Sequence, residues 1–162
     1  MNRIVPISAL FLSAILALPA AAIDEGDGGG GGEVARHRPS ARTDSSFTPL
    51  DQARGAVNEK LFDVAVRRLQ RIVKNEPQNA DAWNLLGYSY RMLGDLDQSS
   101  AAYLQVLAID PNHTGALEYQ GELFLETGKP DLARANLEKL KGLCGNCEGA
   151  EELEKAIQAA GA

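Results

Sequence analysis

The feature that most constrains the fold of this chain is a pattern of residue types that recurs at an interval of 34 positions. Residues in the middle of the chain have counterparts one interval later: Trp83 and Leu117, Gly87 and Gly121, Tyr90 and Phe124, Gly94 and Gly128, Tyr103 and Leu137, and Val106 and Leu140. The same interval also pairs Ala65 with Ser99, Leu69 with Tyr103, Ile72 with Val106, and Pro77 with Pro111. Large residues match large ones and glycine matches glycine, which indicates consecutive copies of one structural unit.

The central copy, residues 80–113, has the pattern of two helices joined by a glycine turn. Its first helix carries the spacing Trp-x2-Leu-Gly-x2-Tyr at Trp83, Leu86, Gly87 and Tyr90. The large residues share one helical face, and Gly87 lets a neighbouring helix approach closely. Gly94 tolerates the left-handed conformation that ends a helix, and Pro111 stops the second helix. This stretch closely resembles a tetratricopeptide repeat, a helix–turn–helix unit of about 34 residues.

We expect three copies followed by one more helix. The copies are predicted at about 46–79, 80–113 and 114–147, and an amphipathic capping helix at 148–160. The first copy lacks the signature and has Gly55 within its first helix, as expected of a terminal repeat. Aspartates recur near the start of the second helices, where they complement the helix dipole: Asp63, Asp97 and Asp131. The predicted fold is an all-α helix–turn–helix solenoid of about three tetratricopeptide-like repeats plus a C-terminal capping helix.

The segment before the repeats has the composition of a targeting sequence and a linker. Arg3 precedes an apolar run, and Pro19-Ala20-Ala21-Ala22 has the small residues of a cleavage site, so residues 1–22 are predicted to be a signal peptide. Residues 23–46 include five consecutive glycines and read as a flexible linker. The predicted location is therefore exported, periplasmic or extracellular, with no membrane association after the signal is cleaved.

The charge and the distribution of reactive residues exclude several function classes. A net charge of −6 does not favour nucleic acid as a partner. The two histidines, His37 and His113, lack partners at the spacing of a metal site, so no metal or cofactor is predicted. No nucleophile and base share a helical face, and we expect no enzymatic activity.

The resemblance also implies where a partner would bind. In this family the first helices of successive repeats line a concave groove. The positions assigned to it here are Asp81, Asn84, Tyr88, Arg91, Met92, Glu118, Tyr119, Glu122, Leu125 and Glu126. Some members hold a peptide's terminal carboxylate with basic and amide side chains, whereas Glu118, Glu122 and Glu126 make the third repeat acidic. We therefore predict a protein or peptide partner that is basic or neutral, with apolar groups for Tyr88 and Tyr119.

Cys144-Gly145-Asn146-Cys147 is the one chemically suggestive motif. It fits a local structural disulfide, which export would favour and which the Gly-Asn turn permits. It also resembles the redox-active Cys-x-x-Cys pair, although no strand–helix–strand pattern accompanies it. Half of a zinc site is the third interpretation, but two further ligands are needed.

These observations favour a non-enzymatic interaction module: an exported adaptor or assembly factor that holds a segment of a partner in its groove. Two alternatives belong to other classes. One is a thiol–disulfide factor that uses Cys144 and Cys147, and the other is a structural protein whose repeats associate with one another.

Overall fold

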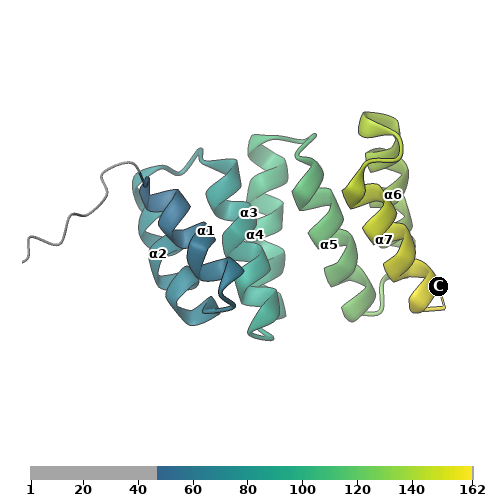
Figure 1. The fold of residues 1–162 in the computed structure, drawn as a ribbon. Helices are drawn as coiled ribbons and strands as arrows, with labels where there is room; N and C mark the ends of the chain where they lie inside the picture. Colours follow the sequence, from purple (N-terminus) through teal and green to yellow (C-terminus); the bar gives the residue numbers. More distant parts are fainter. Residues whose placement is uncertain (1–46, 162) are drawn as a thin grey trace, which may run out of the picture. The chain divides into compact units, whose positions relative to one another are not determined.

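The computed structural model describes residues 47–161, and these residues form seven helices (Figure 1). The helices are α1 (Pro49–Asn58), α2 (Phe62–Asn75), α3 (Ala80–Met92), α4 (Leu96–Ile109), α5 (Thr114–Glu126), α6 (Pro130–Cys144) and α7 (Glu148–Ala159). The all-α prediction is confirmed. The predicted signal peptide, residues 1–22, and the predicted linker, residues 23–46, lie outside the described residues.

The helices stack in the order in which they occur in the chain. Each pair, α1–α2, α3–α4 and α5–α6, packs side by side, and the second helix of one pair contacts the first helix of the next. Figure 1 shows these pairs following one another along the solenoid. A helix pair of this kind cannot bury its apolar side alone, so each pair depends on its neighbours for a core.

Local signals begin and end the helices. Thr48 and Asp51 form a reciprocal capping box at the start of α1, where Pro49 takes the first helical position. The side chains of Asn79 and Asp95 cap α3 and α4 by accepting backbone hydrogen bonds. These caps satisfy N–H groups that have no partner within their own helix.

The core is a series of apolar clusters between successive helices. Ala65, Leu69 and Leu86 are buried between α2 and α3, and Tyr103 and Val106 are buried where α4 meets its neighbours. The last cluster includes the buried side chains of α7, namely Ala150, Leu153 and Ile157. Because α7 contacts both α5 and α6, it covers the apolar face that the third repeat would otherwise expose.

Two glycines allow close approach, as the sequence predicts for the first of them. A Cβ atom at Gly87 would lie 2.7 Å from Cε1 of Tyr103 in α4. At Gly121, the equivalent position of the next repeat, it would lie 2.6 Å from a methyl carbon of Leu153. The neighbour differs because Leu137 replaces the larger Tyr103 in the third repeat, and α7 supplies the contact instead.

Trp83 is less enclosed than its place in the motif suggests. Its ring is half-buried and packs against the clusters on both sides of α3. Its indole N–H donates to the carbonyl oxygen of Pro77 at 3.0 Å. The residue therefore joins two parts of the core while one edge of the ring remains accessible to solvent.

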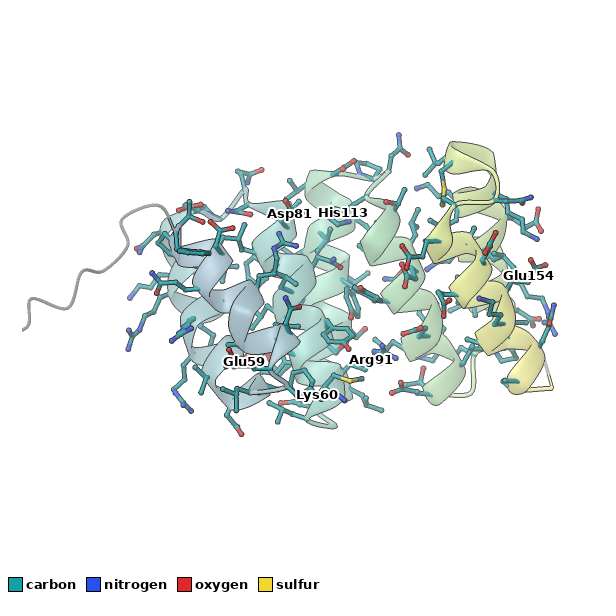
Figure 2. All side chains as sticks on the ribbon, viewed as in Figure 1. Glu59, Lys60, Asp81, Arg91, His113 and Glu154 are labelled. Carbon is teal, nitrogen blue, oxygen red and sulfur yellow. A yellow bond between two sulfur atoms is a disulfide. The ribbon has the colours of Figure 1, made fainter. Side chains whose placement is uncertain are left out.

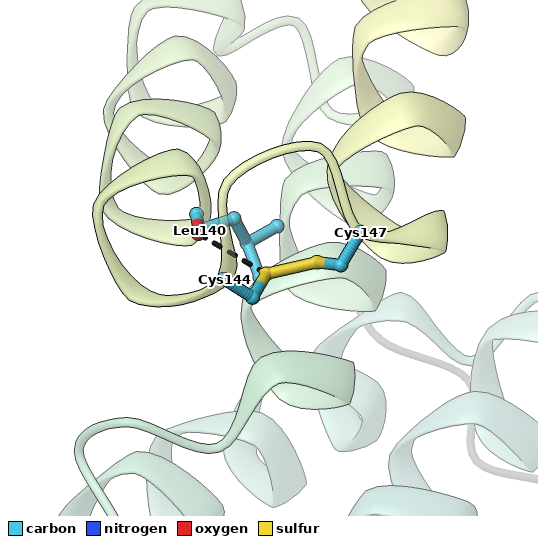
Figure 3. The surroundings of a disulfide bond; sticks show 3 residues. All are labelled: Leu140, Cys144 and Cys147. Carbon is cyan, nitrogen blue, oxygen red and sulfur yellow. Dashed lines mark hydrogen bonds between the residues drawn. A yellow bond between two sulfur atoms is a disulfide. The ribbon is translucent and has the colours of Figure 1, made fainter.

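Cys144 and Cys147 are joined by a disulfide that links the end of α6 to the start of α7 (Figure 3). The Sγ atom of Cys144 lies 3.2 Å from the carbonyl oxygen of Leu140, one turn earlier in α6. Cys147 is half-buried and packs against the last apolar cluster. Within residues 47–161, no helix has the length and apolar character needed to cross a membrane.

Candidate functional site

The first helices of the three pairs lie next to one another and form one continuous face. α1 contacts α3, α3 contacts α5, and α5 contacts α7. A hollow of about 320 Å³ opens on this face, and we call it the aromatic hollow after the rings in its lining. It is lined by Arg54, Val57, Asn58, Lys60, Phe62, Leu85, Tyr88 and Tyr119. Because these residues come from α1, the turn after it, α2, α3 and α5, stacking of all three repeats is needed to build the hollow.

Three rings form a row within the aromatic hollow. The centroids of Phe62 and Tyr88 are 6.0 Å apart in an edge-on arrangement, and those of Tyr88 and Tyr119 are 5.0 Å apart. Burial, followed by the negative charge of Glu118, raises the pKa of Tyr119. Its phenol therefore stays protonated, so the site offers flat apolar surfaces together with a hydrogen-bond donor.

Arg91 lies beside this row and is paired with the acidic residues of the next repeat. Its guanidinium carbon is 5.6 Å from the centroid of Tyr88, and its amino groups donate to Glu122 and, at 2.7 Å, to Glu126. Only 8% of the Arg91 side chain is exposed. The charges of Glu122 and Glu126, which the sequence places on an acidic wall, are therefore largely balanced by Arg91 from within the protein.

The repeat register explains why Arg91 is buried. The equivalent positions, 34 residues away on each side, are Val57 and Leu125, which are apolar and half-buried. An arginine placed at such a position is desolvated, and the charge is tolerated only when counter-charges and hydrogen-bond acceptors are nearby. Glu122 and Glu126 supply them across the α3–α5 contact.

Glu118, at the same end of the face, forms no ion pair within residues 47–161. Burial, and then the neighbouring charges of Glu122, Glu148 and Glu152, raise its pKa to about 7. Its carboxylate lies against the first turn of α7, where Oε2 would be 2.6 Å from a Cβ atom at Gly149. We refer to Glu118, Glu122, Glu148 and Glu152 as the acidic cluster.

The other predicted groove residues do not line the aromatic hollow. Asp81 lies near one end of α3, where its Oδ1 is 3.2 Å from Nε2 of His113 (Figure 2). Nδ1 of the same imidazole accepts from Ala116 N, so His113 caps α5 and Nε2 carries the proton toward Asp81. Asn84 is buried and its amide nitrogen faces Gly115.

Met92 and Leu125 also lie outside the lining of the aromatic hollow. Met92 is exposed at the end of α3. The sequence assigns Leu125 to the groove, but its side chain packs against the apolar cluster of α5, α6 and α7. The reason is that α7 covers this side of α5, and the 34-residue period contains no information on how the last helix is placed.

A family model described as tetratricopeptide repeat matches residues 50–114 and 90–146. The chain belongs to the tetratricopeptide repeat family. Similar proteins include Tetratricopeptide repeat protein 37 of Xenopus laevis, 28% identical over 83 residues, which are 51% of this chain and 5% of that protein. FK506-binding protein-like of Mus musculus is 31% identical over 72 residues, or 44% of this chain and 21% of that protein. The chain thus spans a small part of these relatives.

Solved tetratricopeptide structures share the fold at low sequence identity. The first such domain of Spaghetti (RPAP3), bound to the HSP90 peptide SRMEEVD, has a TM-score of 0.63 at 18% identity, covering 70% of this chain and 91% of that one. The type III secretion translocator chaperone SycD of Yersinia enterocolitica has a TM-score of 0.64 at 15% identity, covering 82% and 94%. SycD in complex with a YopD peptide has a TM-score of 0.61 at 16% identity, covering 73% and 90%.

Most residues that line the aromatic hollow are not among the groove positions predicted from the sequence. The missed residues are Arg54, Val57, Asn58, Lys60, Phe62 and Leu85. Most lie in the first tetratricopeptide repeat, whose first helix lacks the signature and received no groove assignment. Shifting the groove positions of the central repeat back by 34 residues finds three of them, because Tyr88, Arg91 and Met92 correspond to Arg54, Val57 and Asn58. The other three are at positions outside the family's groove pattern.

A larger hollow, of about 530 Å³, lies between the second helices of the first two repeats. It is lined by Gln70, Val73, Lys74, Trp83, Leu86, Tyr90, Gln98, Ala101, Ala102 and Gln105. The side-chain amide of Gln70 donates to the hydroxyl of Tyr90 across it at 2.8 Å. α2 and α4 are not in direct contact, so this hollow follows from the divergence of the second helices. Its lining has two rings, Trp83 and Tyr90, and one positive charge, Lys74, whereas the aromatic hollow has three rings and two positive charges.

Proposed function

We propose that this chain is a non-enzymatic interaction module that holds a segment of a partner protein against the aromatic hollow. The observation that carries the proposal is the row formed by Phe62, Tyr88 and Tyr119, which is accessible from the face made by the first helices. Aromatic residues are enriched at binding hot spots because they bury a large area at a low cost in conformational entropy. Two structural neighbours, one bound to an HSP90 peptide and one in complex with a YopD peptide, support the same kind of partner.

This proposal keeps the predicted preference for basic or neutral residues of the partner, but only at one end of the site. The acidic cluster lies beyond Tyr119, and we propose that it favours basic or neutral residues of the partner at that end. Arg91 pairs with Glu122 and Lys155 pairs with Glu152, so Glu148 contributes most of this preference, and Glu118, whose pKa is raised to about 7, adds to it as it ionises. Apolar residues of the partner would contact the rings.

We also propose that the protein acts outside the cytoplasm, as an adaptor or assembly factor. Support comes from the signal-like composition of residues 1–22 and from the disulfide between Cys144 and Cys147, a bond typical of oxidising compartments. A thiol–disulfide activity is less well supported. Glu148 and Glu151 lie in the first turn of α7, beside Cys147, where their charges disfavour a thiolate.

Site-specific photo-crosslinking in the native host tests the interaction. A photoreactive amino acid would replace Tyr119 in one variant and Leu104 in the other. Leu104 is the matched control, because it is an exposed apolar residue on α4 and lines neither hollow. The proposal predicts a discrete crosslinked protein from position 119 that is absent from position 104. Crosslinks of equal yield and identity from both positions would contradict it.

A further inference from the structure

Lys60 occupies a turn position that glycine takes in the other two repeats. The turns after α1, α3 and α5 make equivalent backbone hydrogen bonds: Lys60 N to Val57 O and Leu61 N to Ala56 O; Gly94 N to Arg91 O and Asp95 N to Tyr90 O; Gly128 N to Leu125 O and Lys129 N to Phe124 O. The φ angle is 59° at Lys60, 80° at Gly94 and 70° at Gly128. A residue with a Cβ atom is disfavoured in this left-handed conformation. The first repeat therefore holds a lysine where glycine would be less strained.

Lys60 and Arg54 are the only charged residues in the lining of the aromatic hollow. Within residues 47–161, neither forms an ion pair. Asp51 lies one turn before Arg54. Its Oδ2 accepts hydrogen bonds from the backbone N and Oγ1 of Thr48, at 2.9 and 2.7 Å. Two cations thus lie beside the aromatic rings without a carboxylate in the same hollow.

We propose that Lys60 and Arg54 bind an aspartate or glutamate side chain of the partner segment, next to an apolar residue held by Tyr88 and Tyr119. This inference rests on the proposed function and adds to it the chemical class of the partner at one end of the site. The occupant is an internal, extended segment of a partner protein. Charge complementarity selects it, because the hollow is positive and apolar while the acidic cluster lies beyond Tyr119. Acidic residues of the segment would accordingly lie toward α1, and basic residues toward α7.

Selection from a random peptide library supplies the probe. The library is displayed with both peptide ends blocked, so that no terminal carboxylate is available, and is selected against the purified chain. We expect the recovered peptides to be enriched in aspartate or glutamate beside an aromatic or aliphatic residue. One recovered peptide and its Asp→Asn or Glu→Gln version are then compared by fluorescence anisotropy at low and high salt.

Four variants separate the contributions. Lys60→Gly and Arg54→Gln should each weaken binding of the acidic peptide by about twofold to fivefold at low salt, as expected for exposed ion pairs, and the effect should fade at high salt. Neither should weaken binding of the amide version. Lys60→Arg keeps the charge and should retain binding. Arg67→Gln removes one positive charge from an exposed position on α2 and should have no effect.

Lys60→Gly should also raise the melting temperature, because glycine adopts the positive φ angle of this turn without strain. Weaker binding by this variant therefore cannot be ascribed to misfolding. Equal weakening of the acidic and amide peptides by Lys60→Gly would overturn the inference, as would recovered peptides without enrichment of acidic residues. Tyr119→Ala identifies failure of the proposed function itself. If it leaves binding of the recovered peptides unchanged, or if no peptide is recovered, the aromatic hollow is not the binding site and both proposals fall.

Discussion

Two glycine-to-alanine substitutions at mid-helix positions should have opposite effects on stability. Alanine is favoured over glycine inside a helix by about 1 kcal/mol. At Gly55, nothing lies within 4 Å of an added Cβ atom, so we expect Gly55→Ala to gain most of that amount. At Gly87, the added methyl group would lie 2.7 Å from Cε1 and 2.9 Å from Cδ1 of Tyr103.

The Tyr103 ring has no room to retreat, because its side chain is fully buried. Overpacking of this kind costs about 1–3 kcal/mol, so after the gain in helix propensity Gly87→Ala should change stability by between zero and a loss of about 2 kcal/mol. The two variants carry the same chemical change, so their difference isolates the clash. Urea unfolding followed by circular dichroism measures it, provided that the m-value is unchanged. Equal midpoints for the two variants would show that α4 can shift to accept a Cβ atom, and would refute the reasoning.

Three further predictions concern the core, a carboxylate and the disulfide. Trp83→Ala should lower the free energy of unfolding by about 2–3 kcal/mol, below the usual range for a fully buried aromatic residue, because the ring is half-buried; urea titration checks it. Burial and neighbouring acidic residues raise the pKa of Glu118 from 4.5 to about 7 in the folded state. The folded protein therefore binds this proton more tightly than the unfolded chain does, and ionisation of Glu118 should reduce stability as pH rises from about 4.5 to 7. Glu118→Gln should therefore be more stable than the wild type above about pH 7, while losing that advantage below about pH 4, as thermal melts across pH would show. Cys144→Ser/Cys147→Ser should cost only about 1–2 kcal/mol, because the closed loop is very short, and the thermal transition should remain cooperative.

The helical array could be predicted because its determinants repeat. Gly94 and Gly128 end α3 and α5 in the left-handed conformation, and the apolar positions of the second helices recur with the same period. These signals are local, or depend only on contact with the adjacent helix. Comparing the sequence of one repeat with that of the next is therefore sufficient to predict the helices. The half-buried state of Trp83 could not be predicted in this way, because how far a ring is covered depends on how the helices are placed around it.

The contents of the aromatic hollow were harder to predict because they depend on contacts between repeats. The pairing of Arg91 with Glu122 and Glu126 joins residues 31 and 35 positions apart on different helices. Side-chain spacing within one helix carries no information on which side chains of the next helix lie opposite. Leu125 shows the same limit, because its burial depends on α7, which follows the last repeat and does not share its pattern.

Differences between equivalent positions are nevertheless informative, because each repeat is a control for the others. Arg91 stands where the neighbouring copies have Val57 and Leu125, and Lys60 stands where they have Gly94 and Gly128. Both substitutions carry a local cost: a desolvated charge in one case and a disfavoured backbone conformation in the other. Natural sequences tend to accept such costs at functional sites. Arg91 lies against Tyr88 and Lys60 lines the hollow that contains it, so two independent departures from the repeat pattern mark the same surface. This agreement favours the aromatic hollow over the larger hollow between α2 and α4 as the binding site.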